Sequence, residues 1–170
     1  TAIEVADGPS AGACYSWRDL ERGPAMMANL LAGLKLPAGS RVAVQTEKSV
    51  EALMLYLAVL RAGHVYLPLN TAYQAAEIEY FIGNAEPAVV VCAPKNFAWV
   101  SRIAFSAGTA HVFTLGEARD GSLRAALMVH KAYMDGLVDV SDRLGTWIEE
   151  AQQQGALNPQ IPAIAVLYTL

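Results

Sequence analysis

Residues 88–92, Ala-Val-Val-Val-Cys, form an unbroken and mostly β-branched run directly after Pro87. A run of this kind is typical of a central strand that is buried on both faces. Apolar runs of similar length predict further strands at residues 41–46, 65–69, 110–115 and 163–168. The chain is therefore expected to build a sheet around residues 88–92.

Helical patterns separate the predicted strands. Ser16 and Asp19 have the spacing of a capping box and predict a helix start. Gly23-Pro24 predicts a kink in this helix or its division into two, because proline lacks the N–H group that continues a helix. The helix is expected to pack through one apolar stripe that comprises Trp17, Leu20, Met27, Leu30, Leu31 and Leu34.

The second predicted helix runs from Ser49 to Arg61 and is apolar nearly all round, which predicts burial on most of its sides. Further helices are predicted at residues 74–82, with Gly83 and Asn84 as the stop, at 97–105 and at 141–154. Strands that alternate with helices predict an α/β layered domain with a mostly parallel sheet flanked by helices.

Size and composition limit the classes of function. The 170 residues suffice for one ordinary domain, and 54% of them are hydrophobic while 16% are charged. A typical soluble domain has about a quarter charged residues, so this chain is apolar for its size. Two explanations are open: most of its helices and strands are buried on both faces, or part of its surface contacts a missing partner. The net charge of −4, without a basic cluster, argues against nucleic-acid binding.

No apolar run reaches the roughly 18 to 20 residues that span a bilayer, and Glu4 and Asp7, without a basic region before an apolar stretch, argue against a signal peptide at residues 1–15. We therefore expect no membrane span and a cytoplasmic location. Cys14 and Cys92 are too few for a disulfide framework, and Cys92 is expected to pack as a small hydrophobic residue.

The residues that could carry chemistry are scattered along the chain. Neither a G-x-G-x-x-G loop nor a Walker loop is present, and His64, His111 and His130 lack metal-ligand spacing. His111 lies in a predicted strand and is interpreted as structural. His64 is interpreted as a loop residue, with contact to a ligand as the alternative.

Other polar residues do not complete a site either. Ser106 and Ser122 have no nearby base that could activate them as nucleophiles, and Lys48 beside Glu47 is interpreted as a solvated pair. Three aspartates could be metal ligands, although their spacing fits a helix entry and its polar face better: Asp135, Asp139 and Asp142. The residues alone predict no catalytic constellation and no metal site.

Three stretches of the chain together resemble the adenylate-forming acyl- and aryl-CoA synthetases. They are residues 15–20 (Tyr-Ser-Trp-Arg-Asp-Leu), residues 41–49 with 60–70, and residues 165–169 (Ala-Val-Leu-Tyr-Thr). Residues 60–69 are similar to the family's L-x-A-G-x-x-Y-x-P-L segment, with His64 where small residues are common. The third stretch is similar to the strand that leads into the family's phosphate loop.

The resemblance varies along the chain. It is good over residues 13–94 and patchy over 95–162, and residues 124–142, which match nothing, are interpreted as an insertion. Malonyl-CoA synthetases are the most similar members over residues 45–53, 66–73, 84–87, 114–115 and 120–123. The resemblance implies that residues 1–170 are an incomplete N-terminal portion of the adenylate-forming enzyme fold, in which residues 163–170 are the strand entering the phosphate loop.

The implied activity is that of a two-step acid–CoA ligase. ATP and an acid, malonate in the most similar members, give an acyl-adenylate and pyrophosphate, and coenzyme A then displaces AMP. ATP, Mg²⁺ and coenzyme A are the implied cofactors of the full-length family, and none is expected for this chain alone. Only Thr169 carries over as a nucleotide-loop residue, because Leu170 stands where the family has serine. The chain is therefore expected to be inactive alone, with no catalytic residue of its own.

Two alternatives stay open. One is an acid–CoA ligase with a different acid specificity, and the other is a non-catalytic α/β interaction module. Self-association is also expected, because the predicted final strand and the helix at residues 50–61 would otherwise expose apolar surface.

Overall fold

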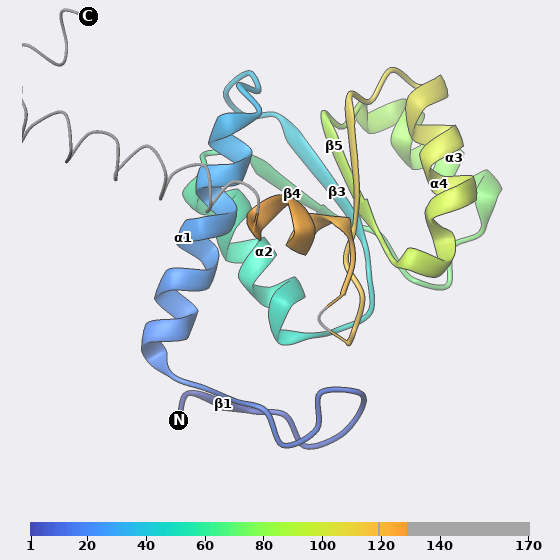
Figure 1. The fold of residues 1–170 in the computed structure, drawn as a ribbon. Helices are drawn as coiled ribbons and strands as arrows, with labels where there is room; N and C mark the ends of the chain where they lie inside the picture. Colours follow the sequence, from blue (N-terminus) through green and yellow to red (C-terminus); the bar gives the residue numbers. More distant parts are fainter. Residues whose placement is uncertain (119, 129–170) are drawn as a thin grey trace, which may run out of the picture. The chain divides into compact units, whose positions relative to one another are not determined.

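A parallel four-stranded sheet with helices on both faces organises the chain in the computed structural model, which describes residues 1–118 and 120–128 (Figure 1). The sheet comprises β3 (Arg41–Gln45), β4 (Val65–Pro68), β5 (Val89–Cys92) and β6 (His111–Thr114) in the order β4-β3-β5-β6. All three strand pairs are parallel. The predicted α/β layered fold with a parallel sheet is confirmed.

The helices divide between the two faces of the sheet. Figure 1 shows α1 (Trp17–Gly33) and α2 (Val50–Arg61) on one side, and α3 (Ala75–Ala85) and α4 (Phe97–Ser106) on the other. A 3₁₀ turn, η1 (Pro94–Asn96), precedes α4, and residues 122–128 are helical. A small antiparallel pair, β1 (Ile3–Glu4) with β2 (Cys14–Tyr15), was not expected from the sequence.

Alternate residues of the central strands supply two separate cores. Val89 and Val91 of β5 pack on the α1–α2 side, whereas Val90 and Cys92 pack on the α3–α4 side. All four are at most 1% exposed, which confirms the prediction of a strand buried on both faces. This alternation follows from the two-residue period of a strand.

Local sequence signals fix both ends of the helices on the first face. Ser16 and Asp19 form the predicted capping box, and the hydrogen bonds from Ser16 to the Asp19 carboxylate lower the pKa of that group. Ser49 accepts a hydrogen bond from the N–H group of Ala52 at the start of α2. Gly63, with φ at +75°, takes the left-handed conformation that follows this helix.

Four details of the helix predictions were wrong. The division of the first helix at Gly23-Pro24 is wrong, since α1 runs through Pro24 to Gly33, whereas the alternative of a kink at that point stays a prediction. Trp17 does not join the buried stripe of this helix but is 75% exposed. α3 continues through Gly83 and Asn84, because the left-handed residue that follows it is Glu86, with φ at +45°. α2 is not buried on most sides: its outward face is exposed. The predicted helix at residues 141–154 and strand at 163–168 lie outside the described residues.

Candidate functional site

The sheet reverses its strand order between β3 and β5. The chain leaves β3 for β4 on one side and then crosses back to β5 on the other. In open parallel sheets, ligands bind beyond the carboxyl ends of the strands at such a reversal. Residues 45–48 at the end of β3 and residues 93–96 after β5 therefore mark the candidate site.

Gln45 is the polar centre of this site. Its side chain is 1% exposed, and its Nε2 atom donates to the carbonyl oxygens of Asn70 and Tyr73, each at 3.1 Å. Its Oε1 atom accepts from Nδ2 of Asn96 at 3.4 Å. One buried amide thus holds the loop after β4 and the turn after β5 at the same edge of the sheet.

The rim of the site is charged and open to solvent. Lys95 Nζ lies 3.2 Å from Glu47 Oε1, so the ion pair joins the ends of β5 and β3 across the reversal. The predicted pairing of Glu47 with Lys48 is therefore corrected to Lys95. The side chain of Lys95 is 70% exposed, and an exposed pair of this kind contributes about 0–1 kcal/mol. A shallow hollow beside the pair is lined by Thr46, Glu47, Lys48, Pro68, Leu69, Asn70, Thr71 and Glu117.

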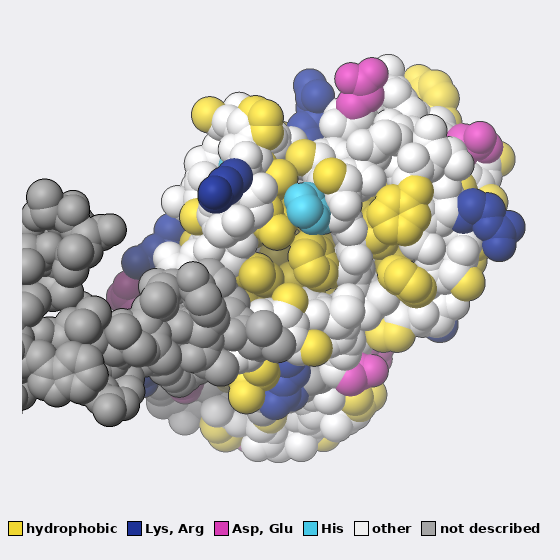
Figure 2. All heavy atoms as spheres, turned by 45° about the horizontal axis from the view of Figure 1, so that its top comes forward, with side chains coloured by type: hydrophobic (Ala, Val, Ile, Leu, Met, Phe, Trp, Pro, Cys, Tyr) yellow, Lys and Arg dark blue, Asp and Glu magenta, His cyan; other side chains and the backbone are white. Residues whose placement is uncertain are grey.

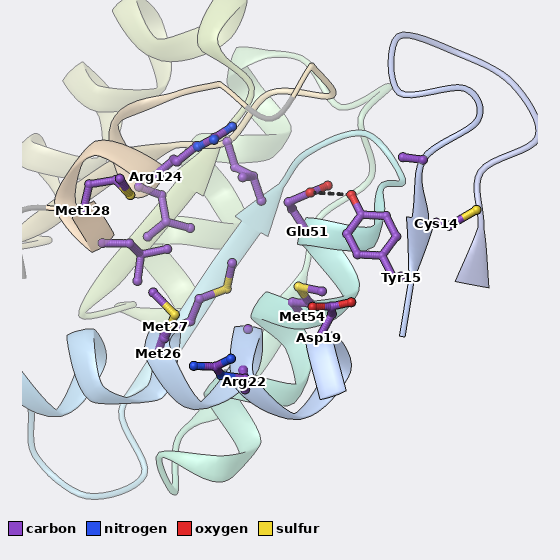
Figure 3. A pocket seen from close by; sticks show the side chains of 15 residues that line it. Cys14, Tyr15, Asp19, Arg22, Met26, Met27, Glu51, Met54, Arg124 and Met128 are labelled. Atoms are coloured by element: carbon purple, nitrogen blue, oxygen red, sulfur yellow. Dashed lines mark hydrogen bonds between the residues drawn. The ribbon is translucent and has the colours of Figure 1, made fainter. Parts of the chain in front are cut away.

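A second cavity lies between α1, α2 and the helical residues 122–128 (Figure 3). Its volume is about 480 Å³, within the range of small-molecule pockets. The walls are mainly apolar and include Met26, Met27, Met54 and Met128. Figure 3 also shows Tyr15 donating to Glu51 Oε1 at 2.8 Å beside the cavity. The cavity thus offers mainly apolar space, with the Tyr15–Glu51 hydrogen bond beside it.

Several candidate residues of the sequence have structural positions. His111 lies half-buried in β6 and stacks with Phe113, as its structural interpretation requires. His64 follows Gly63 in the connection to β4, where it is 9% exposed and lies outside the hollow and the apolar cavity. Ser122 exchanges hydrogen bonds with Thr114: the Thr114 N–H donates to Ser122 Oγ at 2.9 Å, and the Ser122 N–H donates to Thr114 Oγ1 at 2.8 Å.

The remaining candidates are not placed. His130, the three aspartates at 135, 139 and 142, and Thr169 lie outside the described residues. Within residues 1–118 and 120–128, no three His, Cys, Asp or Glu side chains group in a way that could hold a metal ion. Over the same residues, no helix is long and apolar enough to cross a membrane.

Sequence reasoning missed the roles of Gln45 and Asn96. Gln45 ends a strand whose preceding residues are apolar, and a lone amide at the end of a buried strand must find partners for its hydrogen-bonding groups. That signal was present in residues 41–46. The partners were not predictable, because Asn70, Tyr73 and Asn96 are 25 to 51 residues away along the chain.

The two cysteines make a direct test of this part of the fold. Burial raises the pKa of the Cys92 thiol to about 11, while Cys14 is exposed. At pH 8 we expect one fast-reacting thiol in the folded chain and two after denaturation in urea, as counted with a chromogenic disulfide reagent. The Cys14→Ser variant should show none in the fast phase. Fast reaction of that variant would mean that β5 is not buried.

Comparisons with known proteins agree over the described fold. The sequence profile of the family described as AMP-binding enzyme matches residues 2–158. The structure of ATP-bound MatB from Rhodopseudomonas palustris aligns with a TM-score of 0.66 and 50% identity, over 69% of this chain and 23% of that chain.

Curated relatives share less sequence. A nicotinic acid–CoA ligase, pyr1, from Aspergillus fumigatus is 28% identical over 136 residues, which are 78% of this chain and 21% of the relative. A probable CoA ligase, CCL9, from Humulus lupulus is 30% identical over 94 residues, which are 55% of this chain and 18% of the relative. The chain thus spans about a fifth of the length of these two ligases.

Proposed function

The chain belongs to the AMP-binding enzyme family, and from that premise we propose that it serves as the N-terminal part of an ATP-dependent acid–CoA ligase of the malonyl-CoA synthetase type. Such a ligase joins an acid to the AMP part of ATP with release of pyrophosphate, and then transfers the acyl group to coenzyme A with release of AMP. The observation that carries the proposal is the 50% identity to MatB, a malonyl-CoA synthetase, over 69% of the chain. Identity of that extent far exceeds the 28% shared with the nicotinic acid–CoA ligase.

We propose that the described residues provide scaffold rather than reacting groups. Among residues 1–118 and 120–128, no three His, Cys, Asp or Glu side chains group in a way that could hold a metal ion. Adenylyl transfer needs positioned donors and Mg²⁺ around the phosphates, and Mg²⁺ at such sites is typically held by one or two carboxylates together with the phosphates. We assign no step of the reaction to the described residues, and we propose that the chain is inactive alone. Its contribution is the ordered edge around Gln45 and a folded layer for the rest of the enzyme.

A chimera tests the proposal. In it, this chain replaces the matched part of MatB, and a second chimera carries the corresponding part of the nicotinic acid–CoA ligase as control. We expect malonate-dependent ATP–pyrophosphate exchange within about tenfold of MatB for the first chimera, which is a change of at most ~1.4 kcal/mol in the barrier. The control chimera should lose more of the exchange activity of MatB than the first chimera does. This chain alone should show no exchange.

Two outcomes would contradict the proposal. Exchange by the chain alone would overturn its inactivity. A folded first chimera without activity would mean that the chain does not serve as part of this ligase, and would favour a non-catalytic interaction module.

A ligase for another acid is the other alternative, and activity of the extended natural sequence on a panel of acids would decide it. A cytoplasmic location is part of the proposal for either ligase.

Self-association of the isolated chain remains a prediction. The specific observation that favours it is the exposed apolar face of α2. We expect the mean mass from light scattering to rise with concentration and to fall back on dilution. A constant monomer mass up to millimolar concentration would contradict it.

A further inference from the structure

The cavity between α1, α2 and the helical residues 122–128 has a wall rich in methionine. Four of the five methionines of the chain line it: Met26, Met27, Met54 and Met128. They come from three segments that are distant in the sequence, and Figure 3 shows their side chains around the same space. Thioether side chains are flexible and polarisable, and their sulfur atoms pack favourably against aromatic rings. Such a wall suits an aromatic ligand.

The four methionines connect the interior of the cavity with solvent. Met27 and Met54 are each 6% exposed, whereas Met26 is 37% and Met128 is 60% exposed. The volume of about 480 Å³ lies within the range of sites for small molecules. A small molecule can therefore reach the buried thioethers from the surface of the protein.

The two acidic residues of the wall are already hydrogen-bonded. The Asp19 carboxylate accepts from both the N–H group and the hydroxyl of Ser16, each at 2.7 Å. Glu51 accepts from the hydroxyl of Tyr15 at 2.8 Å. Both carboxylates are thus held by donors of the protein, which makes them poorer partners for a ligand.

Arg22 supplies hydrogen-bond donors beside the same cavity. It is exposed on α1, and within residues 1–118 and 120–128 its side chain makes no hydrogen bond or ion pair. Its charge acts on the Asp19 carboxylate only through space. A guanidinium group has five N–H donors, and two of them can bind one carboxylate in parallel. Arg22 is therefore suited to hold the anionic end of a ligand.

The close approach of α1 and α2 at Gly23 shapes the cavity. A Cβ atom added to Gly23 would lie 2.5 Å from Sδ of Met54, which is closer than packed atoms allow. Met54 would have to turn away from α1. Because the side chain of Met54 borders the cavity, this turn would take up space in it.

We propose that this cavity binds a small aromatic carboxylate, with the ring among the methionine side chains and the carboxylate on Arg22. The site is separate from the hollow at the strand reversal, since the two share no lining residue. The inference concerns binding and includes no reaction step. It does not rest on the proposed ligase function.

Nuclear magnetic resonance of the full chain with ¹³C-labelled methionine methyl groups tests the proposal. The signals are assigned with single Met→Leu variants, which nearly preserve side-chain volume. On addition of naphthoate, we expect the signals of Met27 and Met54 to shift and to saturate. Naphthylmethanol has the same ring system without the charge, and should bind at least about threefold more weakly.

Three variants locate the ligand. Arg22→Gln should weaken naphthoate binding at least about threefold and leave naphthylmethanol nearly unchanged. Arg18→Gln is the matched control, since it removes the same charge from α1 at a residue that does not line the cavity, and should change either affinity by less than about twofold. Gly23→Ala should weaken both ligands, because the displaced Met54 side chain fills part of the cavity.

The outcomes that would overturn the proposal are distinct. Without saturable shifts of Met27 and Met54 up to ~10 mM naphthoate, the cavity is not a ligand site. Equal affinity for the two ligands, or equal losses in Arg18→Gln and Arg22→Gln, would show that Arg22 does not hold the carboxylate. If Arg22→Gln does not fold, Gly23→Ala decides: unchanged binding by that variant would mean that the ligand lies elsewhere.

Discussion

Replacing Gln45 by leucine is expected to lower the free energy of unfolding by about 2 to 4 kcal/mol, although leucine is similar in size and apolar. Gln45 is 1% exposed, and its amide nitrogen bonds the carbonyl oxygens of Asn70 and Tyr73. Leucine would leave both acceptors, and the Asn96 amide, without this partner. The loss exceeds that of an ordinary hydrogen bond because polar groups remain at a buried position.

Urea denaturation of the full chain, followed by circular dichroism, measures the effect. Lys95→Ala is the matched control, since it removes an exposed ion pair at the same edge of the sheet and is expected to cost at most about 1 kcal/mol. If Gln45→Leu and Lys95→Ala lower the free energy of unfolding by the same amount, Gln45 does not organise the site as described.

Replacing Gly121 by alanine is also expected to have a large effect, and should lower the free energy of unfolding by about 3 kcal/mol or more. Gly121 has φ at +110°, a conformation that residues with a Cβ atom rarely adopt, and an added Cβ would lie 2.8 Å from the carbonyl carbon of Thr114 and against its oxygen. These are backbone atoms at the end of β6 and cannot rotate away. The clash would also separate Ser122 from Thr114 and withdraw Leu123, which is 1% exposed, from the core.

Gly108→Ala is the control for backbone conformation. Gly108 has φ at +85°, but an added Cβ would meet nothing within 4 Å. The substitution should therefore lower the free energy of unfolding by only ~1–2 kcal/mol, which is the strain of a non-glycine residue in the left-handed conformation. Thermal unfolding of both variants measures the difference in stability. If both variants lose the same stability, the contact between the added Cβ atom and Thr114 does not destabilise the Gly121→Ala variant.

Much of the fold was predictable from local patterns. Residues 88–92 predicted a strand buried on both faces, which the structure confirms. Ser16, Asp19 and Ser49 predicted helix starts, and the structure places the starts of α1 and α2 at these residues. These signals depend on groups within four or five residues of one another. Their interactions are decided mainly by the local chain.

Tertiary packing decided the details that were wrong. Gly23-Pro24 was expected to kink the first helix or divide it, but α1 runs undivided through Pro24 and packs extensively against α2, and packing routinely overrides local propensity. The order of the strands, and with it the site at the reversal, also depends on long-range pairing. Residue types alone could not show that Gln45 and Asn96 meet.

The polar centre of the candidate site was not predicted, because the partners of Gln45 lie 25 to 51 residues away along the chain. The histidines, serines and acidic residues of the sequence suggested no catalytic group, and that expectation stays a prediction. The family resemblance reached further, because it rested on motifs spread over residues 13–94. It implied the α/β fold that the structure shows and the AMP-binding family whose profile matches residues 2–158.

The way β5 is shared between the two cores has a consequence for unfolding. Val89 and Val91 belong to one core and Val90 and Cys92 to the other, so neither core can lose this strand without exposing its counterpart. The two helical layers are thereby coupled thermodynamically, and partial melting of one face alone is disfavoured. Residues 1–118 and 120–128 should lose their structure in a single cooperative transition, with the amide protons of β5 among the last to exchange with solvent.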